Sequence, residues 1–119
     1  MVEVFRAAAD GHIATLEASL REIGAAPELW PGRKDKACDI AHNLKGQGAS
    51  FGYPLITAVA ESLLGFLGGL SEADARLMKI ALAHVGALRT VLDKDIRGEG
   101  GAAGSTLVAR LQGLTGRTA

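Results

Sequence analysis

One histidine in this 119-residue chain has neighbours that suit covalent chemistry. His42 is followed by Lys45 and Gly46, and residues three and four apart are neighbours on the surface of a helix. An accessible imidazole is a nucleophile, and a lysine beside it can offset the charge of an anionic group that the imidazole takes up. A glycine inside an exposed helix costs about 1 kcal/mol relative to alanine, so Gly46 indicates that a partner must come close. The three residues predict transfer of an anionic group to His42.

The helix that carries His42 should turn this side chain towards water. The apolar residues of the segment fall on one side of a helix and are Ala37, Ile40, Ala41 and Leu44. At about 100° per residue, His42 lies roughly 140° from the centre of that group. The residues that share its face, and that we predict to contact a partner, are Cys38, Asp39, Gly46 and Ala49.

The elements that position this segment are helices, because apolar residues recur every three or four positions along most of the chain. Turn residues divide the pattern at Gly24, Pro54 and Gly68. We expect Ser71 to cap the fourth helix, with Asp74 three residues on in a relation like a capping box. The predicted helices span residues 2–23, 35–50, 54–67 and 72–96.

Two segments lie outside this pattern. Residues 25–34 contain two prolines and a glycine, which predicts a connector, with Trp30 folded back onto the bundle. Residues 98–104 are rich in glycine and predict a flexible loop, followed by a short closing helix or a tail at residues 106–114. We therefore expect an all-α protein: an antiparallel four-helix bundle, up-down-up-down, over residues 1–97, with the loop and a short C-terminal helix or tail over residues 98–119.

Composition excludes several classes of function. Lysine plus arginine number 13, as do aspartate plus glutamate, which gives no reason to expect a nucleic acid or a membrane as partner. Cys38 is the only cysteine, so the chain has neither an internal disulfide nor a cysteine-spaced zinc site. The start of the chain lacks the order of a signal peptide, and no apolar run reaches the length of a membrane span. We predict a cytoplasmic protein.

The segment from His42 to Tyr53 resembles the phosphoacceptor segment of histidine-containing phosphotransfer (Hpt) domains. The resemblance rests on His42-x-x-Lys45-Gly46, on the small residues that follow, and on Phe51-Gly52 ahead of the next helix. Through chain length and helix order it extends over most of the chain. Many members place a polar residue, often glutamine, on the following helix to orient the imidazole. That place falls near Leu64 here, where Glu61 and Ser62 are the nearest polar substitutes.

The resemblance implies a phosphocarrier and not an enzyme. His42 would take a phosphoryl group on Nε2 from a receiver-domain aspartate and pass it to another receiver aspartate in a bacterial-type phosphorelay. Lys45 would help to stabilise the phosphoryl group, and Gly46 would keep the docking face open. The chain has no nucleotide-binding glycine loop and no carboxylate cluster for a metal, so Mg²⁺ and the aspartate would come from the partner receiver domain. We expect no cofactor of its own and a monomer.

Two alternatives remain open. The bundle could be a non-catalytic signalling adaptor that docks a partner without accepting phosphate, or a detached substrate domain of a chemotaxis-type histidine kinase. The other histidines, His12 and His84, lack the neighbours of His42, and we interpret them as structural or incidental.

Overall fold

The computed structural model describes residues 2–98 and 101–116 of the chain. The helices are α1 (Val2–Ala25), a short 3₁₀ turn η1 (Pro27–Leu29), α2 (Trp30–Phe51), α3 (Pro54–Gly68), α4 (Ala75–Asp93) and α5 (Gly101–Gly116). The described residues contain no strand. The prediction of an all-α protein is confirmed.

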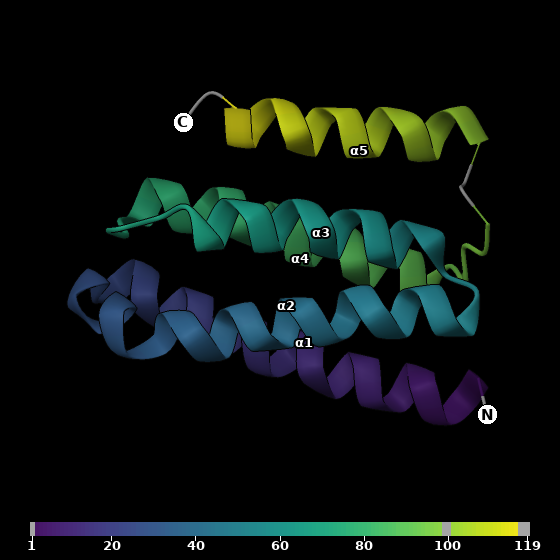
Figure 1. The fold of residues 1–119 in the computed structure, drawn as a ribbon, viewed down its shortest axis with the longest axis horizontal. Coiled ribbons are helices and arrows are strands. Elements are labelled where there is room, and N and C mark those ends of the chain that lie inside the picture. Colours follow the sequence, from purple (N-terminus) through teal and green to yellow (C-terminus); the bar gives the residue numbers. More distant parts are fainter. Residues whose placement is uncertain (1, 99–100, 117–119) are drawn as a thin grey trace.

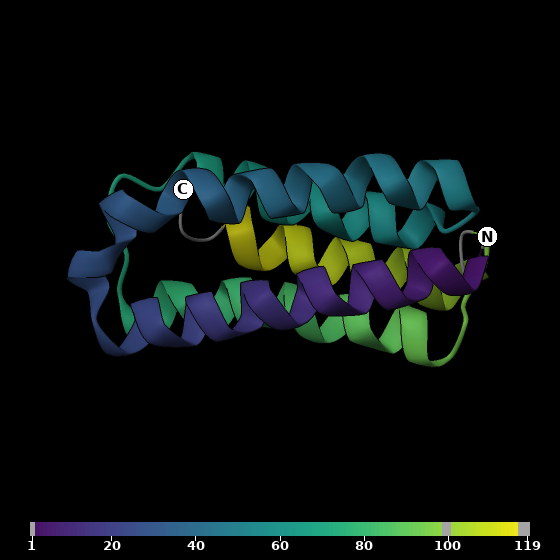
Figure 2. The same ribbon diagram turned by 90° about the horizontal axis from the view of Figure 1, so that it is seen from below.

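The first four long helices form an antiparallel bundle, and the fifth covers one side of it (Figure 1). α2 packs chiefly on α3, and α1 packs chiefly on α4, while α1–α2 and α3–α4 contacts close the bundle. α5 lies on the α3–α4 side, opposite α1 and α2, as the two perpendicular views agree (Figures 1 and 2). The predicted bundle with an extra C-terminal helix is confirmed.

Hydrophobic burial explains why α1 takes its place in the bundle. Its buried side chains recur at intervals of three or four residues and are Phe5, Ala9, Ile13, Leu16, Leu20 and Ile23. Burying a leucine, isoleucine or phenylalanine side chain stabilises the fold by about 1.5–3 kcal/mol. This stripe therefore fixes the rotation of α1 against its neighbours.

α2 begins earlier than the sequence suggested. It starts at Trp30, not near Asp35, and only residues 26–29 connect it to α1. Pro31 fits within the first turn because the backbone N–H that proline lacks has no partner inside a helix there. Trp30 is buried, as expected, and its Nε1 donates to the Leu70 carbonyl at 3.2 Å. Lys34 Nζ donates to the same carbonyl at 2.9 Å, so the start of α2 is tied to the α3–α4 connection.

The cap of α4 also differs from the expectation. Asp74, not Ser71, is the N-cap: its Oδ1 accepts from the Leu77 backbone N–H at 2.7 Å, and the helix begins at Ala75. A carboxylate at this position satisfies an N–H group that has no partner in the helix and lies at the positive end of the helix dipole. The prediction that Ser71 caps a longer helix was wrong.

α5 is longer than the closing helix predicted for residues 106–114. It begins at Gly101, so residues 101–104 of the predicted loop are helical, while residues 99–100 of that loop lie outside the described residues. Leu111 of α5 is buried, and Leu107, Val108 and Leu114 are partly buried against the core. The apolar face of α5 explains why it docks on α3 and α4.

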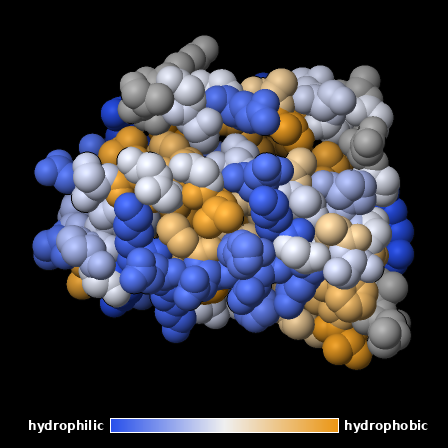
Figure 3. All heavy atoms as spheres, viewed as in Figure 1, coloured by the Kyte–Doolittle hydropathy of each residue, from blue (hydrophilic) through white to orange (hydrophobic). Residues whose placement is uncertain are grey.

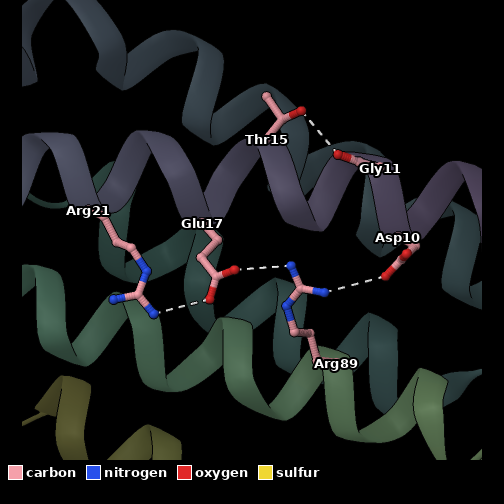
Figure 4. A network of polar contacts seen from close by, with 6 residues as sticks. All are labelled: Asp10, Gly11, Thr15, Glu17, Arg21 and Arg89. Atoms are coloured by element: carbon pink, nitrogen blue, oxygen red, sulfur yellow. Dashed lines mark hydrogen bonds and ion pairs between the residues drawn. The ribbon is translucent and has the colours of Figure 1, made fainter.

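Ion pairs join α1 to α4 on the side away from α2 and α3 (Figure 4). The Arg89 guanidinium of α4 reaches Glu17 at 3.0 Å and Asp10 at 3.4 Å, both on α1. Arg21 also contacts Glu17, at 3.3 Å. The hydrogen bond from Arg89 is the main reason that the pKa of the Glu17 carboxyl is lowered. These contacts support the α1–α4 packing that the apolar stripe establishes.

Candidate functional site

Close packing of α2 against α3 holds the segment that carries His42. Gly48 of α2 is buried, and a Cβ added there would lie 2.8 Å from Thr57 Oγ1 and 2.9 Å from the Thr57 backbone nitrogen. The Thr57 hydroxyl donates to the Lys45 carbonyl at 2.8 Å, which ties the two helices together beside the candidate site. α2 ends at Phe51, and its C-cap is Gly52, whose φ of 85° lies in the left-handed region that favours glycine. Small residues thus bring α3 close to the site.

His42 lies on the exposed side of α2, as the helical geometry predicted. Its chain neighbour Ala41 and the next apolar residue, Leu44, are fully buried, whereas His42 is exposed. The view onto α2 and α3 shows hydrophilic side chains gathered along α2 (Figure 3). Among the described residues, no hydrogen bond or ion pair reaches the imidazole of His42. The ring is therefore open to an incoming group.

Lys45 and Gly46 lie beside this imidazole on the same helix. Lys45 keeps 39% of its side chain exposed, and its Nζ lies 4.0 Å from Glu61 Oε1 of α3. No atom lies within 4 Å of a Cβ built on Gly46, so the space next to it is empty. The open approach that the sequence predicted at Gly46 is present. The pairing of Lys45 with Glu61 was not predicted, because sequence periodicity does not give the register between two helices.

The residues predicted to contact a partner differ in exposure. Asp39, Gly46 and Ala49 are exposed. Cys38 is half-buried and packs against the core, and burial raises the pKa of its thiol. A thiol with a raised pKa is a poor nucleophile at neutral pH, so Cys38 suits packing better than chemistry.

Neither Glu61 nor Ser62 of α3 hydrogen-bonds the His42 imidazole, so neither fills the orienting role suggested for them. Glu61 reaches Lys45, and the Ser62 hydroxyl hydrogen-bonds His84 at 3.0 Å. Leu64 is partly buried against the core. Within the described part of the chain, the candidate site therefore consists of His42, its helix neighbours Lys45 and Gly46, and Glu61 of α3, which pairs with Lys45.

His84 is a core residue with both ring nitrogens bonded. Its Nδ1 lies 2.9 Å from the Ile80 carbonyl, which can only accept, so Nδ1 carries the proton and Nε2 accepts from Ser62. The ring stacks on Phe66 at a centroid distance of 6.4 Å. Burial lowers the pKa of His84, which is fully enclosed. Its place on the apolar stripe of α4, three residues after Ala81, is the sequence feature that indicates this burial.

We predict that His84 makes the fold less stable in acid. Its pKa in the unfolded chain is near 6.5 and is lower in the folded protein, so below pH 6.5 the unfolded state binds more protons. The free energy of unfolding from urea titrations should therefore fall with pH from about 6.5 downward, by at most about 1.4 kcal/mol per unit from this group. His84→Gln should reduce that slope. Equal slopes in wild type and His84→Gln would contradict the assignment.

The described residues contain neither a metal-binding cluster nor a membrane-spanning helix. Between residues 2–98 and 101–116, no cluster of three or more His, Cys, Asp or Glu side chains could hold a metal ion. In the same part of the chain, no helix is both long enough and apolar enough to cross a membrane.

Comparison with known families gives one result. A family model described as the Hpt domain matches residues 1–97, which contain α1 to α4 and the candidate site, while α5 lies beyond the match. Comparisons with curated proteins and with solved structures gave no significant match. Hpt domains are phosphocarrier modules that exchange phosphoryl groups with receiver domains. Because the match covers most of the chain and the bundle agrees with it, this protein belongs to the Hpt domain family and has a histidine phosphotransfer role in phosphorelay signalling.

Proposed function

We propose that this Hpt domain accepts a phosphoryl group on Nε2 of His42 from the aspartyl phosphate of one receiver domain and passes it to the aspartate of another. The observation that carries the proposal is the position of His42. It is exposed on α2, with Lys45 and the unobstructed Gly46 on the same side. Of the other histidines, His84 is buried with both nitrogens bonded, and His12 is partly buried.

The proposed step conserves atoms and charge. The lone pair of His42 Nε2 forms the new P–N bond while the P–O bond to the receiver aspartate breaks, and the carboxylate leaves with the electron pair. The proton on Nδ1 takes no part in the step. Transfer to the second receiver reverses these events. Such transfer depends chiefly on in-line positioning and on neutralising charge, so a rigid helix presenting one imidazole can supply half of the active site.

The remaining parts of that active site would come from the partner. The receiver domain would contribute the aspartate and Mg²⁺, and this chain would bind no cofactor of its own. Lys45 would offset part of the phosphoryl charge in the complex. We further propose that the protein acts as a monomer in the cytoplasm, with receiver domains of hybrid kinases and response regulators as its partners.

Donor choice and the chemistry of the label test this proposal. The purified chain is mixed with a ³²P-labelled receiver domain, and separately with an ATP-using chemotaxis-type kinase domain. A label that comes from the receiver and is lost in acid but kept in base supports a relay on histidine. A label from the kinase domain alone would indicate the detached substrate domain of a kinase, and no label from either would indicate a docking adaptor.

We predict that Gly46→Gln slows transfer without harming the fold. A Cβ at residue 46 has no atom within 4 Å, and glutamine is favoured over glycine in a helix, so the melting temperature should not fall. It would project into the space through which the receiver must approach His42, and misplacing reacting groups by about 1 Å can cost on the order of 100-fold in rate. Rapid-quench measurements of transfer should therefore show a rate at least about tenfold lower. An unchanged rate would remove the steric role of Gly46.

A further inference from the structure

Lys45 has a carboxylate partner on α3 that the Hpt assignment does not explain. Lys45 Nζ lies 4.0 Å from Glu61 Oε1; the Lys45 side chain is 39% exposed and the Glu61 side chain is 66% exposed. An exposed pair of this kind contributes little to folding stability, because water screens it. The ion pair can still set the orientation of the Lys45 side chain when no other anion is present.

The packing of α2 on α3 places Glu61 opposite the stretch from His42 to Lys45. The helices run antiparallel, Gly48 meets Thr57, and the Thr57 hydroxyl binds the Lys45 carbonyl. Glu61 lies one turn after Thr57 on α3. Because the helices are antiparallel, this step along α3 leads back along α2 from Gly48 to Lys45 and towards His42. Glu61 therefore draws Lys45 across to α3.

Glu61 also has room to release its partner. It lines a groove of about 690 Å³ between α3 and α5, together with Ser62, Gly65 and Gln112. Its carboxylate can turn into this open space when Lys45 turns towards another anion. The lysine can thus exchange one partner for another without a change in the backbone.

We propose that Glu61 is a positioning residue that competes with the phosphoryl group for Lys45 and so favours passing the group on. This inference rests on the proposed phosphorylation of His42. When His42 is phosphorylated, Lys45 must leave Glu61 to neutralise the new charge, and the lost ion pair raises the free energy of the phosphorylated form. Without Glu61, the phosphohistidine would accumulate to a higher level.

The test is the equilibrium between phosphorylated receiver and phosphorylated chain, in wild type, Glu61→Gln, Lys45→Met and the double variant. Glu61→Gln should shift this equilibrium about two- to fivefold towards phosphohistidine, the change that an exposed ion pair commonly produces. In the Lys45→Met background the same substitution should have a much smaller effect. Glu72→Gln removes an equal charge from the exposed α3–α4 connection and should have no effect.

Each outcome decides for or against the role of Glu61. No shift in Glu61→Gln, a shift towards the phosphorylated receiver, or an equal shift with and without Lys45 would overturn the proposal. High salt screens the pair, so the difference between wild type and Glu61→Gln should shrink as ionic strength rises. Before this comparison, the wild-type chain must be shown to accept the phosphoryl label from the receiver domain, and His42→Gln must be shown not to accept it. Failure of that step would reject the proposed function itself and is distinct from failure at Glu61.

Discussion

We expect His42→Gln to abolish labelling of the chain by a phosphorylated receiver domain. Glutamine keeps a polar side chain of similar reach but has no nitrogen that can act as a nucleophile towards phosphorus. Because His42 is exposed and its side chain has no partner in the described structure, the substitution should leave the melting temperature within about 1–2 °C of wild type. The measurement is ³²P transfer from a labelled receiver, followed by gel electrophoresis at neutral or alkaline pH. We expect labelling to fall to background.

The matched control is His12→Gln on α1. His12 lies on α1 and is partly buried, and this variant should be labelled as wild type is. Equal labelling of wild type and His42→Gln would contradict the assignment of the acceptor, whatever the result for His12. Circular dichroism of each variant shows whether the fold is retained, so that loss of label is not confused with unfolding.

Gly48→Ala lowers the free energy of unfolding by about 2–3 kcal/mol, the largest effect on stability that we predict. The new methyl group would lie 2.8 Å from Thr57 Oγ1 and 2.9 Å from both the Thr57 nitrogen and Ile56 Cγ2. Two of these atoms belong to Thr57, whose hydroxyl also holds the Lys45 carbonyl, so relief requires α2 and α3 to separate. Calorimetry should show a fall in melting temperature of roughly 5–10 °C.

Gly46→Ala is the matched control, two residues away on the same helix. A methyl group there meets no atom within 4 Å, and alanine is favoured over glycine in a helix by about 1 kcal/mol. This variant should therefore be more stable than wild type. If the two alanine variants changed stability by similar amounts, the close approach of α2 to α3 at Gly48 would be refuted.

Periodicity was sufficient to predict much of the bundle. The stripe from Phe5 to Ile23 is buried as expected, because one apolar face at helical spacing has a single favourable orientation. The same reasoning placed His42 on the exposed side of α2. Helix ends were less predictable: Pro31 reads as a helix breaker although the first turn accepts it, and Ser71 and Asp74 compete as caps. These choices depend on tertiary contacts, such as those of Trp30 with Leu70.

Contacts between helices could not be predicted, because they depend on register. Glu61 and Ser62 were the polar residues nearest to the expected orienting position, yet one pairs with Lys45 and the other with His84. The contact of Gly48 with Thr57 was likewise not predicted, although it sets how closely α3 approaches the site. The residues that act on the acceptor segment within α2 were thus predictable, and those that act on it from α3 were not.

The most direct test is the location of the phosphoryl group on the chain after reaction with a phosphorylated receiver domain. Electron-transfer fragmentation at neutral pH preserves phosphohistidine and assigns the added mass to a single residue. We expect every phosphorylated molecule to carry the mass of one phosphoryl group on His42, with His12 and His84 unmodified. A phosphoryl group on another residue, or fragments around His42 that remain unmodified in a labelled protein, would contradict the central claim.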